Sequence, residues 1–206
     1  MKIVREGLPF ILAPLLLAGV LLVLNLWHFA LLLVVISLFM AFFFRNPERI
    51  PPNASSLVVA PADGHVTRIA SVSADDKESG TVVSIFLSPF DVHINRSPIA
   101  GRITDISYIP GKFLMATNEK ASLVNEQNVL TIEGSETTVV CKQIAGILAR
   151  RVVCWKRKGD NLKLGERFGM IKFSSRTDLI LPANVKVIVE VGARVRGGTT
   201  VIGQVQ

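Results

Sequence analysis

The chain has 206 residues, of which 50% are hydrophobic, with a net charge of +7 and a mean hydropathy of +0.45. This is more apolar than an ordinary soluble globular domain, so we expect one soluble domain together with a membrane segment. A single Tyr and two Trp leave little for base stacking, and nothing resembles a nucleic-acid-binding module, so we expect no nucleic acid among the partners.

The first 44 residues are predicted to anchor the chain in a membrane. Residues 7–44 contain no Asp, Glu, Lys or Arg, and this run is nearly twice the ~20 residues that one span needs. A polar stretch at 25–28 lies near its middle, so we expect two helices, at about 8–24 and 29–44, in a transmembrane or re-entrant hairpin. A single long tilted span is the alternative. A secretory signal peptide is not expected, because its apolar core of about 7–15 residues is much shorter than this run.

Basic residues flank this run on both sides. Lys2 and Arg5 precede it, and Arg45 and Arg49 follow it. Because Lys and Arg near a span favour the cytoplasmic side, we expect a cell-membrane protein whose flanks and active domain are cytoplasmic. The positive net charge beside an anchor also favours contact with anionic lipid headgroups.

Residues 45–56 are predicted to be a linker, because Pro47, Pro51 and Pro52 oppose helix formation. Residues 57–206 consist of short β-branched runs separated by Gly, Pro, Asn and Asp. This pattern predicts a β-rich domain, and hence an α+β chain that is mainly antiparallel β. Helical segments are expected near 119–125 and 145–150. The predicted strands are 56–60, 65–70, 81–87, 104–108, 127–132, 137–142, 151–156, 169–173, 178–181 and 185–191.

The two cysteines, Cys141 and Cys154, form neither a CxxC pair nor a metal-ligand spacing. No metal site is therefore predicted. Both lie in apolar, β-branched stretches, so we expect small core residues in a reducing compartment, with a disulfide between them as the alternative.

The phrase at 191–198, followed by 199–202, resembles the hammerhead turns of biotinyl- and lipoyl-type β-barrels. A swinging-arm carrier is not supported, because no Lys occupies a hairpin tip in the usual Met-Lys setting. A membrane-tethered, biotinyl-like binding module without enzymatic activity is the alternative function that this pattern leaves open.

A loop between two prolines carries the histidine best placed for chemistry. His93 lies near Asp91, Asn95 and Arg96 within the segment 87–101. This density of polar groups on a loop favours proton transfer. Asp91 and Arg96 are equally well explained as residues that staple the loop.

Ser174 and Ser175 are two small hydroxyl residues where a strand would be expected to fill the core. A serine hydroxyl there could attack a nearby carbonyl, including that of its own preceding peptide bond. A serine hydrolase is another use of such a residue, but no G-x-S-x-G elbow surrounds either serine.

Several phrases occur in an order that is specific as a set although each is weak alone. They are Phe43–Arg49, Ala62-Asp63-Gly64, Ser88–Pro98, Pro110–Phe113, Ile144–Arg151 and Gly165–Arg176. With them the chain resembles, over nearly its whole length, the short, membrane-anchored class of phosphatidylserine decarboxylase. An enzyme for an archaeal lipid with the same phosphoserine headgroup would fit as well.

The resemblance implies a proenzyme that cleaves itself between Ser174 and Ser175. Ser175 would become an N-terminal pyruvoyl group, and the products 1–174 and 175–206 would be partners in the mature enzyme. The pyruvoyl carbonyl would supply the electron sink that amino-acid decarboxylation needs, in place of pyridoxal phosphate. The reaction would convert phosphatidylserine in the bilayer into phosphatidylethanolamine and CO2. The family normally has glycine where this chain has Ser174.

The resemblance also suggests roles for other residues. His93 would supply the proton in decarboxylation, and Asp63 matches the acidic residue of the self-cleavage machinery. Arg96 stands where some relatives have a second histidine, so the base for cleavage is left open between His93 and His65. Candidates for the substrate phosphate are Arg45, Lys112 and Arg150. A homo-oligomer is also left open.

Overall fold

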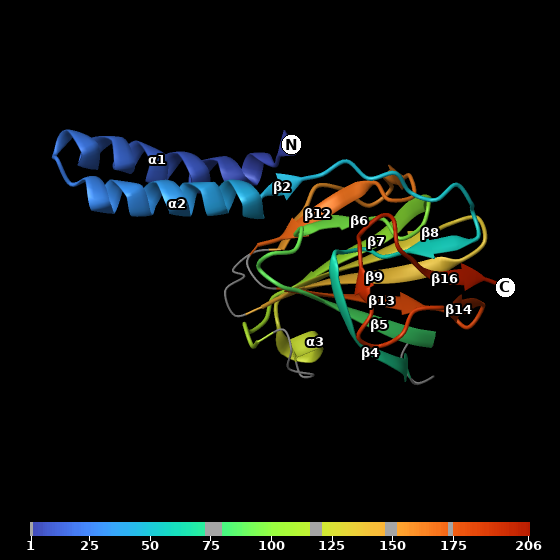
Figure 1. Cartoon of the computed structure of the whole chain (residues 1–206). Coiled ribbons are helices and arrows are strands. Elements are labelled where there is room, and N and C mark those ends of the chain that lie inside the picture. The colour runs from blue at the N-terminus through green and yellow to red at the C-terminus, as the bar shows by residue number, and fades with distance from the viewer. Residues whose placement is uncertain (1, 73–79, 116–120, 147–151, 173–174) are drawn as a thin grey trace. The chain divides into compact units, whose positions relative to one another are not determined.

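The computed structural model describes residues 2–72, 80–115, 121–146, 152–172 and 175–206. The chain forms two compact units, residues 1–48 and residues 49–206 (Figure 1). The first contains two helices, and the second is built almost entirely from antiparallel strands.

Unit 1 is a helical hairpin. The short 3-10 helix η1 (Arg5–Gly7) leads into α1 (Leu8–Val23), and α2 (Trp27–Phe43) returns beside it. The strands β1 (Lys2–Ile3) and β2 (Arg45–Asn46) pair with each other, so the two ends of the hairpin meet. Arg45 and Asn46 therefore lie in a strand, within the segment predicted to be a linker.

The turn of the hairpin has a clear local cause. Asn25 takes a positive φ of 60°, which Asn tolerates better than most residues with a side chain. The N–H of Leu26 donates to the carbonyl of Leu21 at 2.8 Å, and that of Asn25 donates to Leu22 at 3.0 Å. These are the two bonds of a Schellman motif, and they end α1 at the polar stretch that the sequence pointed to.

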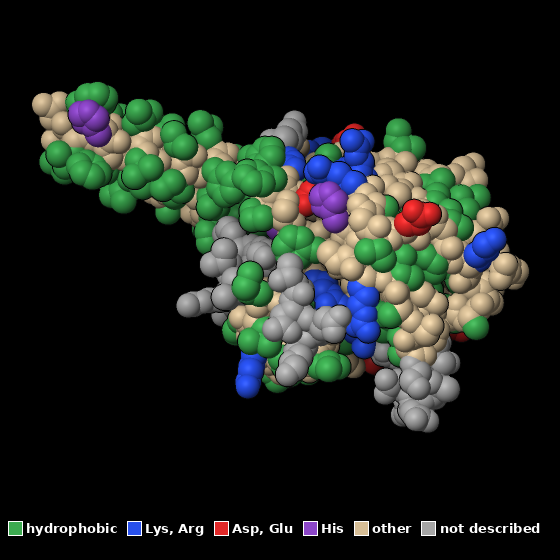
Figure 2. Space-filling view, turned by 60° about the horizontal axis from the view of Figure 1, so that its bottom comes forward, with side chains coloured by type: hydrophobic (Ala, Val, Ile, Leu, Met, Phe, Trp, Pro, Cys, Tyr) green, Lys and Arg blue, Asp and Glu red, His purple; other side chains and the backbone are tan. Residues whose placement is uncertain are grey.

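The surface of the hairpin is apolar. Figure 2 shows hydrophobic side chains over most of its visible face. The helix at Arg5–Val23 is long and apolar enough to cross a membrane, and Trp27–Phe43 is a shorter apolar helix. Side chains such as Leu16 and Val23 are 73% and 88% exposed, respectively, which suits contact with lipid better than with water.

Unit 2 contains one large curled sheet and two small ones (Figure 1). The large sheet has eight strands in the order β11-β7-β8-β9-β13-β5-β4-β15, and every neighbouring pair is antiparallel. In chain order its strands are β4 (Gly64–Val72), β5 (Gly80–Leu87), β7 (Gly101–Ile109), β8 (Gln127–Glu133), β9 (Thr138–Ala145), β11 (Asn161–Leu162), β13 (Ser175–Leu181) and β15 (Arg194–Val195).

The two small sheets have three strands each. One has the order β10-β12-β6, and the other has the order β14-β16-β3. A four-residue helix, α3 (Ala121–Val124), precedes β8. The strands are β3 (Leu57–Val59), β6 (Ile94–Arg96), β10 (Val152–Cys154), β12 (Arg167–Ile171), β14 (Val185–Val187) and β16 (Val201–Val205).

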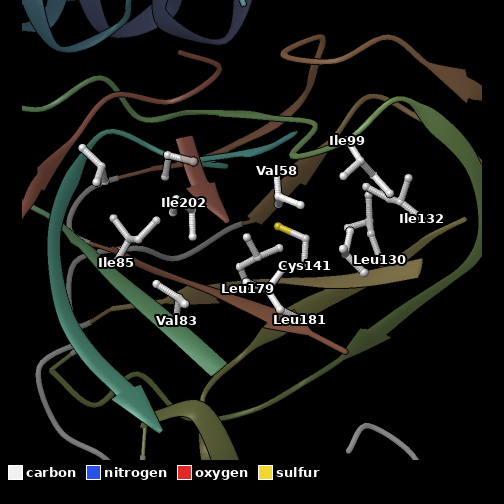
Figure 3. Packing of buried hydrophobic residues seen from close by; sticks show 14 of the residues in the cluster. Val58, Val83, Ile85, Ile99, Leu130, Ile132, Cys141, Leu179, Leu181 and Ile202 are labelled. Atoms are coloured by element: carbon white, nitrogen blue, oxygen red, sulfur yellow. The ribbon is translucent and has the colours of Figure 1, made fainter. Parts of the chain in front are cut away.

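The hydrophobic core lies between the large sheet and the β14-β16-β3 sheet. Inward-facing residues alternate along each strand of the large sheet, as a half-buried antiparallel sheet requires. Val58 of β3 and Ile202 of β16 meet them from the other side (Figure 3). The remaining labelled core residues in that view are Val83, Ile85, Ile99, Leu130, Ile132, Cys141, Leu179 and Leu181.

The predicted antiparallel β architecture is confirmed, with some local differences. Ala145, predicted to start a helix, is the last residue of β9, and 147–150 lie outside the described residues. Cys141 and Cys154 are free thiols, so the alternative of a disulfide is wrong. The C-terminal segment forms β15 and β16, which pair with β4 and with β14 and β3. Its likeness to biotinyl-type turns stays a prediction.

Candidate active site

Ser175 is the first residue of β13, and its environment is unusual. It is fully buried, between its cross-strand partners Leu87 on β5 and Ala145 on β9. Among the described residues its Oγ has no hydrogen-bond partner. A buried hydroxyl without a partner costs about 1–3 kcal/mol, so this position calls for an explanation other than stability.

Polar side chains continue along the same face of β13. Thr177 lies two residues beyond Ser175, opposite Gln143 on β9, so all three side chains are on one side of the sheet. The Thr177 hydroxyl accepts a hydrogen bond from Asn95 Nδ2 at 3.0 Å. Because Asn95 belongs to β6, this bond joins the small β10-β12-β6 sheet to the large one.

We call the four residues Asn128, Gln143, Asn95 and Thr177 the amide network. Asn128 Nδ2 donates to Gln143 Oε1 at 3.0 Å, and Gln143 Nε2 donates to Asn95 Oδ1 at 2.8 Å. All four side chains are buried. A satisfied buried network of this kind fixes one arrangement of the strands that carry it.

Gly169 on β12 makes room for this network. A Cβ at this position would lie 2.8 Å from Gln143 Nε2 and 2.3 Å from the carbonyl oxygen of Val153 on β10. Both approaches are shorter than a carbon atom allows. Glycine is therefore needed here for close packing of the two sheets.

His93 immediately precedes β6 and is fully buried. Its Nδ1 lies 3.0 Å from the carbonyl oxygen of Asp91. A carbonyl can only accept, so Nδ1 carries the proton and Nε2 has the lone pair in the neutral ring. The Nε2 atom of His93 is thus the one able to accept a proton.

His93 and Ser175 are connected through two intermediate residues. The carbonyl of His93 accepts a hydrogen bond from the N–H of Ile171 at 3.2 Å. Ile171 packs in a small hydrophobic cluster with Ala145, the cross-strand neighbour of Ser175. Ile171 and Ala145 thus link the segments that carry His93 and Ser175, which are 82 positions apart in the sequence.

The loop between Leu87 and His93 is held by Asp91. Its Oδ2 accepts hydrogen bonds from the N–H and the hydroxyl of Ser88, at 2.9 and 2.7 Å. Its Oδ1 accepts one from Arg194 at 3.2 Å. Asp91 is thus a loop-stapling residue, one of the two interpretations that the sequence allowed.

Asp63 makes different contacts. Its Oδ2 pairs with Arg49 Nη2 at 2.7 Å, and its Oδ1 accepts from the N–H of Gly197 at 2.8 Å. The contacts described above link His93 to Ser175 through β12 and β9, whereas Asp63 contacts Arg49 and Gly197. Its expected part in self-cleavage stays a prediction.

The sequence comparisons identify the family of the chain. A model of the family described as phosphatidylserine decarboxylase matches residues 36–203. The chain belongs to the phosphatidylserine decarboxylase family. The match includes His93, which adjoins β6, and Ser175, which begins β13.

Relatives named phosphatidylserine decarboxylase proenzyme cover nearly the same length. The chain is 45% identical to one from Syntrophus aciditrophicus strain SB over 206 residues, 98% of this chain and 96% of the relative. It is 46% identical to one from Symbiobacterium thermophilum over 98% of this chain and 95% of that relative. Membership in a family of decarboxylases identifies the chain as an enzyme, and disfavours the alternative of a binding module without activity.

The three residues predicted to bind the substrate phosphate fall in different places. Arg45 belongs to unit 1, where its Nη1 donates to the carbonyl of Phe42 at 2.9 Å and its guanidinium lies 3.8 Å from the ring centre of Phe42. Lys112 forms an isolated backbone bridge with Asn125. Arg150 lies outside the described residues, as does Ser174. No finding tests these three as ligands of the phosphate.

Sequence reasoning missed several buried polar residues near Ser175. It did not single out Gln143 or Thr177, and it did not foresee that Arg176 would be buried with Asp178, to which its Nε donates at 2.6 Å. The sequence did contain a signal, because Gln143 is the one polar residue among the alternating inward positions of β9, which are otherwise Val139, Cys141 and Ala145. No group of three or more His, Cys, Asp or Glu that could hold a metal occurs in the described part of the chain.

Proposed function

We propose that this chain is a proenzyme that cleaves itself between Ser174 and Ser175, and then decarboxylates phosphatidylserine to phosphatidylethanolamine and CO2. The observation that carries the proposal is the buried Oγ of Ser175, at the first position of a central strand, which has no hydrogen-bond partner among the described residues. The name proenzyme, given to its relatives, is consistent with maturation by cleavage.

The cleavage chemistry uses the chain's own atoms. The Oγ of Ser175 attacks the carbonyl carbon of Ser174, loses its proton to a base, and forms an ester as the C–N bond breaks and the amine takes up a proton. Loss of the Cα proton then expels the Ser174 carboxylate and leaves dehydroalanine. Addition of water and loss of ammonia give the pyruvoyl group.

The site's own residues suit this group and its task. Ala145 opposite Ser175 is small and apolar, and burial keeps bulk water away. When bound to substrate, the pyruvoyl group would supply the electron sink for loss of CO2. His93 would hold and deliver the proton at Nε2, because its Nδ1–H is committed to the carbonyl of Asp91.

Exposed apolar side chains support a lipid as substrate. One end of the large sheet is formed by the first residues of β13 and β8 and the last residues of β5 and β9. Ile109, which pairs with Gln127 at that same end, is 43% exposed, and nearby in the chain Leu123 is 80% exposed. Apolar groups of this kind suit contact with the acyl chains from which the substrate must be taken. Other exposed apolar residues that follow β5 or lie between the end of β7 and β8 are Phe90, Tyr108, Phe113, Met115 and Val124.

We also infer that the hairpin lies in the cell membrane and that unit 2 is cytoplasmic. Pairing of β1 with β2 brings both ends of the hairpin to one side. Lys2, Arg5, Arg45 and Arg49 all lie at or beyond these ends, as expected for a cytoplasmic side rich in Lys and Arg.

The test is intact mass spectrometry of the purified full chain. The wild type should yield fragments 1–174 and 175–206, and the smaller should carry an N-terminal ketone that reacts with hydroxylamine. Ser175→Ala should remain one chain of 22.4 kDa. Ser97→Ala is the matched control, because Ser97 is also fully buried, and it should still cleave. A wild-type chain that stays whole in membranes would refute the proposal.

A further inference from the structure

A cavity of about 900 Å³ lies in unit 2, and Ser175 is not among the residues that line it. Its walls include Arg49 and residues 51–55 at the start of unit 2, Arg96 on β6, and residues 163–167 around the start of β12. This volume is within the range of sites that hold a small organic ligand.

The walls of this cavity are strongly basic. Arg49, Arg96, Lys163 and Arg167 all line it, against one acidic residue, Glu166. Arg49 is already paired with Asp63, and Glu166 with Lys156, which lies outside the lining. In the described part of the chain, the side chains of Lys163 and Arg167 have no hydrogen bond or ion pair. The cavity thus retains positive charge that the fold itself does not neutralise.

The arginines are close enough to repel one another. Arg96 and Arg167 are directly opposite on β6 and β12, where like charges are unfavourable. Arg96 is only 7% exposed. Burial, followed by the neighbouring charges of Arg49 and Arg167, lowers the pKa of Arg96 to about 10. Arg96 is still protonated at neutral pH, so a bound anion would relieve this repulsion.

Two glycines let Arg96 lie deep in the wall. Gly165 and Gly198 both have positive φ, and a Cβ on Gly198 would lie 2.7 Å from Cδ of Arg96. Arg96 Nη1 donates to the carbonyl of Gly165 at 3.1 Å. The guanidinium is therefore held in place before any ligand binds, which lowers the entropic cost of binding.

This cavity is at the opposite end of β12 from the decarboxylase site. Arg167 begins the strand, whereas Ile171, which bonds to His93, ends it. Four residues of strand span about 13 Å. The amine and phosphorus of a phosphoserine headgroup are separated by four bonds, or at most about 6 Å. The headgroup is therefore about half as long as the separation between the two ends of β12.

We propose that this cavity is a second, phosphate-binding site, which takes a phosphate ester that is not the headgroup being decarboxylated. Three guanidinium groups and one ammonium favour a phosphate, whose oxygens accept paired bonds from Arg. The ester belongs either to an anionic lipid headgroup or to a soluble phosphate. Arg49 directly follows the apolar hairpin unit along the chain, so a lipid headgroup is one candidate source of the phosphate.

The experiment compares two single-charge variants of the full chain. Arg167→Gln removes an exposed strand cation that lines the cavity, and Lys186→Gln removes an exposed strand cation on β14 that does not. Glycerol 3-phosphate is titrated at constant ionic strength into detergent-solubilised protein, and binding is followed by ³¹P NMR. The same chains in nanodiscs of phosphatidylcholine, with or without phosphatidylglycerol, report lipid binding through the thermal midpoint.

The outcomes separate the two sources of phosphate. If a soluble ester is the ligand, Arg167→Gln should weaken its binding about tenfold or more, while Lys186→Gln leaves it unchanged. If a lipid is the ligand, glycerol 3-phosphate should not bind, and the midpoint shift caused by phosphatidylglycerol should be lost only in Arg167→Gln. Equal behaviour of the two variants in both assays would overturn the proposal. Neither assay needs cleavage or decarboxylation, so failure of the proposed function would not affect the result.

Discussion

Replacing Gln143 with leucine should destabilise unit 2 by several kcal/mol. The change keeps a side chain of similar size but removes both ends of the central amide of the network. Asn95 Oδ1 loses its donor at 2.8 Å, and Asn128 Nδ2 loses its acceptor at 3.0 Å. Each buried group left without a partner costs about 1–3 kcal/mol, so the two together predict about 2–6 kcal/mol. That is a large fraction of an ordinary domain's stability of about 5–15 kcal/mol.

The measurement is guanidinium unfolding followed by the fluorescence of Trp155, which lies in unit 2. Both chains should carry Ser175→Ala, so that cleavage does not differ between them. Gln204→Leu is the matched control, because it makes the same chemical change at an exposed position of β16. We expect a lower midpoint with an unchanged slope for Gln143→Leu alone. A change no larger than that of Gln204→Leu, within about 0.5 kcal/mol, would show that the network does not hold the sheets together.

Two other expectations concern single side chains. His93→Gln should lower CO2 release from phosphatidylserine vesicles by about 10²–10⁴-fold, the usual contribution of a positioned proton donor, while His65→Gln changes it little; the reverse order would assign the proton to His65. Burial raises the pKa of the Cys154 thiol, and burial first, then the charges near it, raises that of Cys141, so fewer thiolates form at a given pH. Iodoacetamide near pH 8.5 should modify both only after unfolding, and rapid labelling of the folded chain would contradict this.

The hairpin and most strands could be predicted because their signals are local. The uncharged run at 7–44 shows where the helices lie, and β-branched runs mark β5 and β8 closely. The start of β13 could not be predicted in this way. The predicted strand began at 178, whereas β13 begins at Ser175. Its first residues are polar, and pairing on both sides with β5 and β9 makes them a strand.

β6 was missed for a related reason. The triplet Ile94-Asn95-Arg96 shows no β-branched run, and it becomes a strand by pairing with β12 and by the bonds of Asn95 to Gln143 and Thr177. Such contacts between distant segments have no local signature. A shared site of Ser175 and His93 could therefore be predicted only from the resemblance to a family, and it stays a prediction. The amide network could be seen only in the fold.

The position of β13 within the large sheet bears on how the mature protein would hold together. The segment 175–206 contributes β13, β14, β15 and β16. Of these, β13 pairs with β5 and β9, β15 with β4, and β16 with β3 of the preceding segment, whereas β14 pairs only with β16. A cut before Ser175 falls at the end of a strand, so it removes none of these pairings. The two products would be interlocked through two sheets and a shared core, and neither could leave without unravelling the domain. The proposed cleavage would thus sever the backbone while the strand pairing of the domain is retained.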